Sequence, residues 1–364
     1  YLADLIEAGY HVAICEQVGE EPVNGLVPRQ VVRVVTPGTV VEPGLLPGDA
    51  NNYLACVVVQ HPGTSGPGRA GIAFADITTG EFAVTEVGAG ELRGENILAA
   101  VQSELLRLRP AEVLFPDTLK GLNGIPGYQT SWPAWRFEPG RCEETLLRHF
   151  EVASLDGFGL RGSSLGIRAA GGILQYLSET QPSALKLLTR LSTYSLSEFM
   201  ILDAATRRNL ELTETLRGAS GPGSLLHVLD HTITPMGNRL IRQWVSKPLL
   251  DVDQIARRQA GVTLFFGDGL LRAELRAAVK SLADLERLTN RVLGGSAMPR
   301  DLISVRETLA QLPGLRDLLP GSHPALADIQ QEFDICAAEL DLLEQALAED
   351  PPATLQNLGV IRPG

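Results

Sequence analysis

The sequence lacks long hydrophobic runs and a cysteine framework. No window approaches the roughly 18 consecutive apolar residues that a membrane-spanning helix requires, so we expect no membrane partner. Its four cysteines, Cys15, Cys56, Cys142 and Cys336, are far apart and form no CxxC pair. This pattern favours reduced thiols in a cytoplasmic protein over a disulfide framework or a zinc site.

Motifs that would mark an active site are missing as well. The sequence contains no GxxxxGKS/T phosphate loop, no GxSxG, no HExxH, and no GxGxxG between a strand and a helix. His227 and His231 have the spacing of two metal ligands on one helical face, but they lack a third ligand, and Pro235 follows closely. We therefore expect ordinary imidazoles there, with no metal, no cofactor and no catalytic site in this chain.

An excess of positive charge is also missing. The 31 Lys and Arg residues are outnumbered by 43 Asp and Glu residues, which gives a net charge of −12. Such a chain does not coat nucleic acid or an anionic membrane by bulk charge, so any contact with DNA must be local. Arg29 and Arg33 bracket the otherwise apolar RQVVR, where the residues alone favour a solvated strand edge over a phosphate contact.

An initiator methionine is absent too. The first residues, YLADLIEAG, read as the last turns of an amphipathic helix, with Gly9 as its stop. We therefore expect a piece of a longer protein.

The length of 364 residues suits two or three domains. Strand-like patterns dominate the first part of the chain and helical patterns the rest. Alternating and apolar runs predict strands at 11–18, 30–35, 53–59, 70–77, 81–86 and 112–115. A Pro/Gly-rich linker is expected at 41–50 and a helix over 91–108. From about residue 165 helical stripes dominate: one stops at Pro313, and the last, over 326–347, predicts a helix of about 35 Å.

The stretch LDAATRRNLELTETLRG, residues 202–218, has the start and stop signals of one helix. Asp203 can cap its start and Gly218 can end it. Helical spacing places Asn209 in an apolar stripe, and two adjacent guanidinium groups, Arg207 and Arg208, stand beside it. The residues leave two interpretations open: a catalytic or phosphate site, or a polar joint that holds several segments together.

Two carboxylates in the first half raise a nuclease as an alternative function. Asp76 and Glu81 flank a strand turn at Thr78-Thr79-Gly80, but two-metal chemistry needs several carboxylates around two ions. The expected first strand, 53–59, contains none. Structural turn residues are therefore the favoured interpretation of both.

Several blocks together resemble one family. In chain order they are VAICEQVGE, VVRVVTPGT, LDAATRRNLELT, LDHTITPMGNRLIRQWV, LADLERLTNRV and PRDLISVRETLAQLP, and they resemble the MutS family of bacterial mismatch-recognition proteins. The resemblance runs from Tyr1 to Gly364. It implies a multidomain α/β plus all-α fold: the end of a mismatch-binding domain (1–40), a linker (41–50), an RNase-H-like α/β connector (51–155) and the first part of a helical core and lever domain (156–364).

The resemblance also implies what the whole protein does. The parent would be a cytoplasmic homodimer that binds mispaired or unpaired bases in DNA, kinks the duplex, and uses ATP and Mg²⁺ to become a sliding clamp that recruits MutL. The family's Phe-x-Glu wedge would lie upstream of Tyr1, and its clamp and ATPase domain beyond Gly364. This chain would supply connector and lever without chemistry of its own. The alternative is an RNase-H-like, structure-specific nuclease related to Holliday-junction resolvases.

Individual residues acquire roles through the same resemblance. Arg29 matches the family's DNA-backbone-contacting Arg, four residues before the Arg of VVR, and Arg33 is expected to form a structural ion pair. The 202–218 helix would lie in the core near the connector, away from any active site. We therefore expect a structural polar joint made of Asp203, Arg207, Arg208, Asn209 and Glu211, with Asn209 buried.

Overall fold

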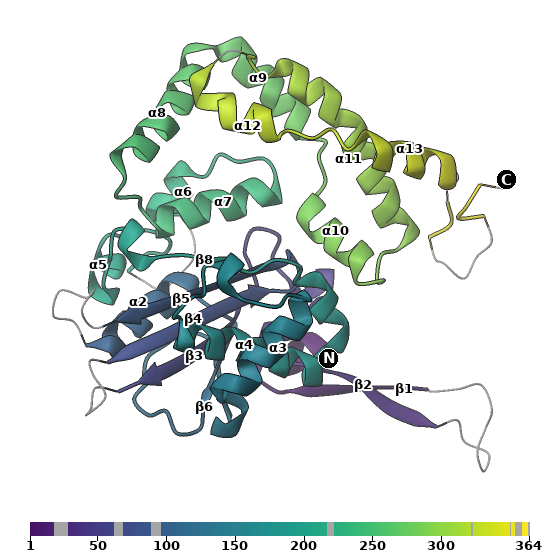
Figure 1. The fold of residues 1–364 in the computed structure, drawn as a ribbon. Helices are drawn as coiled ribbons and strands as arrows, with labels where there is room; N and C mark the ends of the chain where they lie inside the picture. The colour runs from purple at the N-terminus through teal and green to yellow at the C-terminus, as the bar shows by residue number, and fades with distance from the viewer. Residues whose placement is uncertain are drawn as a thin grey trace. The chain divides into compact units, whose positions relative to one another are not determined.

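The chain divides into an α/β unit and a helical unit (Figure 1). The computed structural model describes residues 1–17, 28–61, 68–88, 96–216, 222–321, 323–349, 351–353 and 359–362. Unit 1 comprises Tyr1–Ser197 and Ile201–Leu210, and unit 2 comprises Glu198–Met200 and Glu211–Gly364. The expected mixture of α/β and helical parts is confirmed. No helix of the described residues is long and apolar enough to cross a membrane.

A six-stranded mixed sheet forms the centre of unit 1. Its order is β7-β6-β3-β4-β5-β8. The middle strands β3 (Leu54–Gln60), β4 (Arg69–Asp76) and β5 (Glu81–Gly88) form an antiparallel meander, as the apolar runs and the Thr-Thr-Gly turn predicted. Three further strands run parallel to their neighbours: β6 (Glu112–Pro116), β7 (Tyr128–Trp132) and β8 (Ser192–Thr193).

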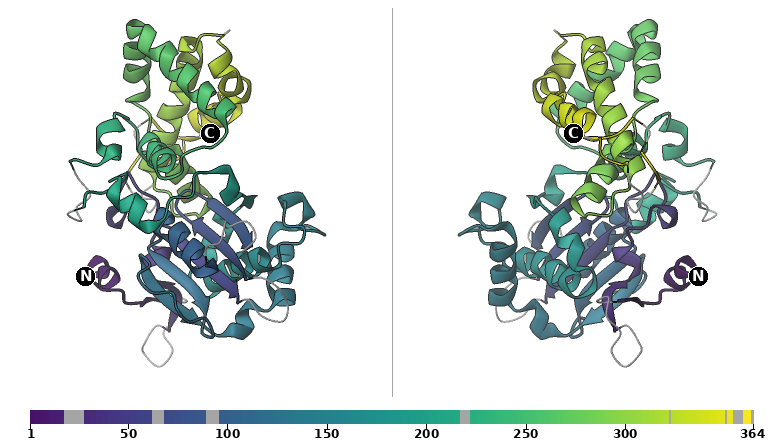
Figure 2. Two further views of the ribbon diagram at one scale, coloured as in Figure 1. Left: turned by 90° about the vertical axis from the view of Figure 1, so that its left-hand side faces the viewer. Right: turned by 90° about the vertical axis from the view of Figure 1, so that its right-hand side faces the viewer.

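Helices cover both faces of this sheet, which explains why β3 is apolar on both sides (Figures 1 and 2). Helix α2 (Ile97–Leu108) packs on one face, and α3 (Pro139–Phe150) and α4 (Ser164–Thr180) pack on the other. Helix α4 approaches β4 so closely that a Cβ on Gly71 would lie 2.1 Å from the carbonyl oxygen of Leu165. The short helices η3 (Ala134–Phe137), η4 (Asp156–Phe158) and η5 (Pro182–Leu187) complete this layer.

The boundary predicted after residue 155 comes too early. Helix α4 packs against β3 and β4, and β8 pairs with β5, so the sheet unit continues to Ser197. The reason is physical: a helix that packs on a sheet has the same 3.6-residue period as one that packs on other helices. Periodicity alone therefore gave no sign that α4 belongs with the strands before it.

A two-stranded antiparallel ribbon precedes the sheet. After α1 (Leu2–Glu7), strand β1 (Val12–Gln17) pairs with β2 (Arg29–Val35), with Val12 opposite Val35 and Gln17 opposite Arg29. In Figure 1 the purple ribbon extends away from the sheet. The short helices η1 (Pro37–Thr39) and η2 (Pro43–Leu45) lead from β2 into the expected linker region.

Unit 2 consists of helices. They are α6 (Leu225–Leu229), α7 (Pro235–Ser246), α8 (Val252–Gly267), α9 (Gly269–Val279), α10 (Leu285–Leu293), α11 (Pro299–Leu318), η7 (Pro324–Leu326), α12 (Ala327–Glu332) and α13 (Ala337–Ala346). At the passage between the units lie η6 (Leu196–Glu198) and α5 (Ala204–Asn209).

Two predicted helix bounds in this unit are wrong. The single helix over 326–347 is divided into α12 and α13 by residues 333–336, from an extended Phe333 to a left-handed Cys336 with φ of 51°. Helix α11 continues through Pro313, where the sequence predicted a stop. Its packing against α9, α10 and α13 outweighs the local preference of proline.

Candidate nucleic-acid interface

Arg29 is the first residue of β2, at the far end of the ribbon from the sheet. Its side chain is exposed, and among the described residues its guanidinium has no ion-pair or hydrogen-bond partner. A solvated guanidinium in a regular strand can donate to a phosphate oxygen without first breaking a bond within the protein.

Arg33, four residues further along β2, forms an ion pair within the chain. Its Nη2 donates to Oε1 of Glu42 at 2.7 Å, and both side chains are half-buried. The expected structural ion pair is therefore confirmed. The two arginines of RQVVR differ in that only Arg29 remains available to a ligand.

The predicted polar joint at 202–218 is built differently from the expectation. Asp203 caps α5: its Oδ1 accepts a hydrogen bond from Thr206 N at 2.6 Å, and the hydrogen bonds from Thr206 lower the pKa of Asp203. The helix ends at Asn209, and Glu211 follows with φ of 46°. A single helix over 202–218 is therefore wrong, and Gly218, its expected end, lies outside the described residues.

The expected burial of Asn209 is also wrong. Both Asn209 and Arg208 are exposed. Because α5 ends there, the apolar stripe that would have enclosed the amide does not continue, and Asn readily occupies such helix ends. Glu211 accepts a hydrogen bond from Leu216 N at 2.6 Å.

Arg207 lies close enough to a buried polar network on α2 for its charges to affect the pKa of Arg207. Its Nε donates to the carbonyl of Leu202 at 3.1 Å, and burial, followed by the nearby positive charge of Arg107, lowers the pKa of Arg207. On α2, Arg107 binds Glu104 through two hydrogen bonds of 2.7 and 2.6 Å. Tyr194 donates to the same carboxylate at 2.6 Å. This network attaches the segment after β8 to α2.

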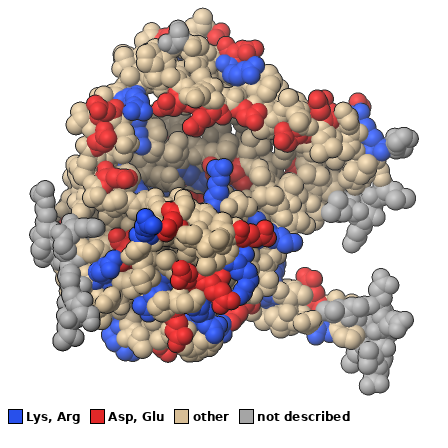
Figure 3. Space-filling view, viewed as in Figure 1, with Lys and Arg blue, Asp and Glu red and all other residues tan. Residues whose placement is uncertain are grey.

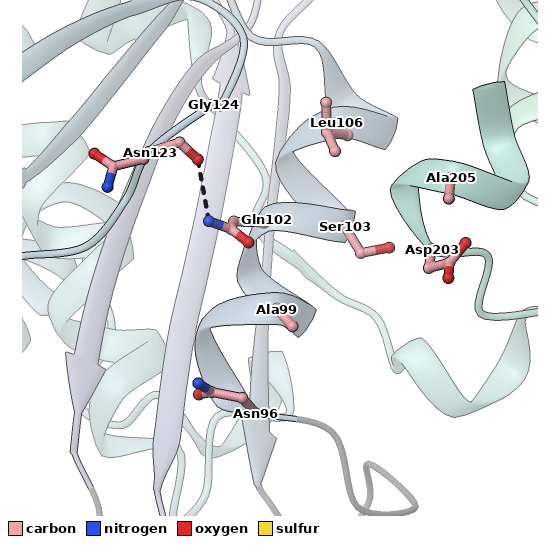
Figure 4. Close-up of a pocket in the computed structure, with 9 residues that line it drawn as sticks. All are labelled: Asn96, Ala99, Gln102, Ser103, Leu106, Asn123, Gly124, Asp203 and Ala205. Carbon is pink, nitrogen blue, oxygen red and sulfur yellow. Dashed lines mark hydrogen bonds between the residues drawn. The ribbon is translucent and has the colours of Figure 1, made fainter.

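An open pocket of about 480 Å³ lies beside this attachment (Figure 4). Its lining residues are Asn96, Ala99, Gln102, Ser103, Leu106, Asn123, Gly124, Asp203 and Ala205. The polar groups bind the protein itself: Gln102 donates to the carbonyl of Asn123 at 3.1 Å, and Ser103 donates to the carbonyl of Leu202 at 2.8 Å.

The two carboxylates that suggested a nuclease are occupied by protein donors. Asp76 is fully buried and accepts from Asn51 Nδ2 (2.9 Å), Asn52 N (3.2 Å) and both the N–H and hydroxyl of Thr78 (2.9 and 2.7 Å). Glu81 accepts from the hydroxyl of Tyr53 at 2.8 Å. These contacts confirm the interpretation as structural turn residues.

A metal site finds no support in the described ranges. They contain no group of three or more His, Cys, Asp or Glu side chains placed to hold an ion. His227 and His231 are both exposed, and α6 ends between them at Leu229.

Two buried carboxylates escaped the sequence analysis. Glu104 lies on the packed side of α2, and Glu112 begins the buried strand EVLFP with no solvent exposure. Each is an acid at a core position, a placement that proteins tolerate only where the charge is paired or hydrogen-bonded. An acidic residue at an apolar phase of a helix or strand is the signal that could have found them.

Charge on the surface of unit 1 is mixed. On the face that Figure 3 shows, Lys and Arg side chains are interspersed with Asp and Glu. No broad basic surface is visible on that face, so bulk charge there would not attract nucleic acid.

Comparison with known proteins gives a consistent family along the chain. Residues 1–43 match the family model described as MutS domain I, 52–191 match MutS domain II, and 205–363 match MutS domain III. The second match, like the sheet itself, extends well past residue 155.

Curated relatives agree with these matches. The proteins named DNA mismatch repair protein MutS from Synechococcus elongatus, Symbiobacterium thermophilum and Dehalococcoides mccartyi are 41%, 39% and 39% identical to the chain. Each alignment covers 100% of this chain and 42%, 41% and 41% of the relative. The chain thus spans less than half the length of the relatives that it matches. On this evidence the chain belongs to the MutS family.

Proposed function

We propose that the chain works as part of a protein that recognises mispaired or unpaired bases in DNA and initiates their repair. One observation carries the proposal: three MutS domain models match in consecutive order, and full-chain relatives at 39 to 41% identity are named DNA mismatch repair protein MutS. The whole protein would bind mismatched duplex as a homodimer, use ATP and Mg²⁺, and recruit MutL in the cytoplasm.

In this proposal unit 1 supplies the end of the mismatch-binding domain and the connector, and unit 2 supplies the first part of the core and lever. The topology supports an RNase-H-like connector, because an antiparallel meander is followed by two strands parallel to its first strand, with helices on both faces. The chain itself would carry the signal between the DNA and the ATPase domain of the whole protein. It would perform no chemistry.

The nuclease alternative is not favoured. Strand β3 carries no carboxylate, and the carboxylates of Asp76 and Glu81 already accept hydrogen bonds from the protein. A direct test incubates the purified chain with Mg²⁺ and a branched DNA. We expect no cleavage; metal-dependent incision by the chain that is lost in Asp76→Asn purified in the same way would revive the alternative.

Arg29 is the DNA contact that we propose for this chain. It would bind a backbone phosphate, which positions a protein on DNA without reading sequence. Its exposure and lack of a described partner support the role. The segment after β8 would be held to α2 by Tyr194 through Glu104 and by Ser103 through the carbonyl of Leu202, which Arg207 also binds, while Asp203 caps α5; this would take the place of the joint centred on Asn209.

Binding of short duplexes tests the proposed function. Fluorescence anisotropy at moderate salt compares a G·T mismatch with the matched duplex, for the whole protein and for this chain alone. We expect the whole protein to prefer the mismatch and this acidic chain to bind weakly, with less than about tenfold discrimination, because it gains little from counterion release. Equal affinities in the whole protein would refute the proposal.

Nucleotide binding is the second test. The sequence has no Gly-rich cradle of backbone N–H groups for phosphates, so calorimetric titration of this chain with MgATP should give no saturable heat. Saturable micromolar binding would show a nucleotide site within these residues.

A further inference from the structure

Glu112 is a buried carboxylate at a meeting point of several segments. It is the first residue of β6, where it lies opposite Leu54 of β3 and Tyr128 of β7. Its side chain has no solvent exposure. A charge in such a place costs several kcal/mol unless hydrogen bonds replace its water, so its partners show what the residue does.

Four donors surround the carboxylate. Oε2 accepts from the Thr36 hydroxyl at 2.5 Å and from Gly38 N at 3.0 Å, both directly after β2. Oε1 accepts from the Thr130 hydroxyl at 2.6 Å on β7 and from the Tyr176 hydroxyl at 2.7 Å on α4. Each oxygen thus uses both lone pairs. One oxygen faces the ribbon and the other faces the sheet and its covering helix.

Two neighbours of Glu112, Tyr176 and Gly38, have properties that these hydrogen bonds require. Burial, and then the negative charge of Glu112, raise the pKa of Tyr176, so its hydroxyl keeps the proton that it donates. A Cβ at position 38 would lie 2.9 Å from the Glu112 Cβ and 3.0 Å from Leu54 Cδ1, so glycine is needed for the chain to approach this closely.

One end of the ribbon lies at this point, where β1 begins and β2 ends. Thr36 follows Val35, the last residue of β2, and Val35 pairs with Val12, the first residue of β1. His11, just before β1, has its Nε2 3.7 Å from Glu112 Oε1 and packs edge-on against Tyr128. The near end of the ribbon is therefore fastened at Glu112.

We propose that Glu112 is a positioning residue whose carboxylate fixes the direction in which the β1–β2 ribbon leaves the sheet, and thereby the place of Arg29 (Figure 1). The first half of this statement rests on contacts within unit 1. The second half, the consequence for DNA binding, rests on the proposed function.

Asp76 provides a matched control. It is also a fully buried carboxylate with four donor contacts, but its donors belong to Asn51, Asn52 and Thr78, around the ends of β3 and β4. Asp76→Asn should disturb the sheet as Glu112→Gln does, yet leave the four hydrogen bonds of Glu112 in place. Its link to the segment after β2 is indirect, through Asn52, whose Nδ2 donates to the carbonyl of Pro37 at 3.1 Å. Each substitution keeps the side chain's size and turns one acceptor oxygen into an N–H₂ donor that faces other donors.

The direction of the ribbon can be measured with spin labels. Cys15 is exposed on β1, and Glu143 is exposed on α3, so labels at Cys15 and Glu143→Cys report the distance from ribbon to sheet layer. Cys336→Ser removes the other accessible thiol. Cys56 and Cys142 are buried, and burial raises the pKa of Cys142 to about 11, so neither competes for the label.

Pulsed electron–electron double resonance then decides the first half of the proposal. We expect one narrow distance distribution for the labelled chain and for Asp76→Asn, and one on the order of twice as broad for Glu112→Gln, since an unfastened ribbon samples more directions. An unchanged distribution in Glu112→Gln overturns the proposal, and so does equal broadening in both variants. If Glu112→Gln does not fold, Thr36→Val removes only the ribbon-side hydroxyl and serves the same test.

A double-mutant cycle in the whole protein decides the second half. Glu112→Gln and Arg29→Ala should each weaken mismatched-duplex binding severalfold, and the double variant should bind about as well as either alone, because both act through one contact. Additive losses would show that Glu112 does not act through Arg29. Because the spin-label experiment contains no DNA, failure of the anchor and failure of the proposed function remain distinguishable.

Discussion

Two polar regions of unit 1, the stretch around α5 and the surroundings of Glu112, differ in how many polar side chains the sequence shows and in how deeply those side chains are buried. The stretch around α5 concentrates charged and amide side chains, yet Arg208 and Asn209 are exposed. Around Glu112 the sequence shows one acid at the start of an apolar strand, and that carboxylate binds four donors from three segments. A polar side chain holds a structure together where packing has removed its water, and adjacency along the chain does not create that condition.

The largest effect should come from removing the buried acid. Glu112→Leu leaves four donors without an acceptor, and breaking a buried charged cluster costs about 3–5 kcal/mol. We expect the free energy of unfolding of the α/β unit to fall by about 3 kcal/mol in urea titrations followed by tryptophan fluorescence. A loss below about 1 kcal/mol would mean that water reaches the carboxylate, and the contrast with α5 would disappear.

An intermediate effect is expected where the α5 region does reach the core. Tyr194→Phe removes one donor from the buried Glu104 carboxylate, and a hydrogen bond to a charged group contributes about 1.5–3 kcal/mol. We expect a loss of about 1.5 kcal/mol by the same titration. Tyr10→Phe, at an exposed tyrosine, is the control and should change nothing measurable. Equal effects of the two substitutions would show that Tyr194 is not part of a buried network.

The smallest effect belongs to the residue that the sequence placed at the centre of the joint. Asn209 is exposed, and exposed substitutions outside caps usually stay within about 0.5 kcal/mol. Asn209→Leu should therefore leave the melting temperature of the chain almost unchanged. A loss above about 1 kcal/mol would restore the buried amide and contradict the position that the structure gives it.

The sequence predicted the elements that depend on local pattern. The strands of the meander and the Thr78-Thr79-Gly80 turn follow from apolar runs and turn chemistry, and the stop of α1 follows from Gly9, whose φ is 81°. An ion pair at Arg33 was expected, but its partner, Glu42, was not predicted from the sequence.

The sequence could not predict features that depend on which segments meet. Helix α4 has an ordinary helical period, so nothing local showed that it packs on the sheet. The interpretation of Asn209 assumed that one helix continues to residue 218, and a left-handed Glu211 ends that assumption. The sequence placed Glu112 at the start of a strand but could not show its four donors, which lie between 18 and 76 residues away in the chain.

The proposed contact between Arg29 and DNA is tested most directly by comparing the two arginines of β2 in the whole protein. Binding of a G·T duplex is titrated against salt for Arg29→Ala and Arg33→Ala. If Arg29 contacts a phosphate, Arg29→Ala should weaken matched and mismatched duplexes by a similar factor and flatten the slope of log affinity against log salt by about one counterion, while Arg33→Ala leaves the slope unchanged. An Arg29→Ala protein with wild-type affinity and slope would contradict the assignment of Arg29 to DNA.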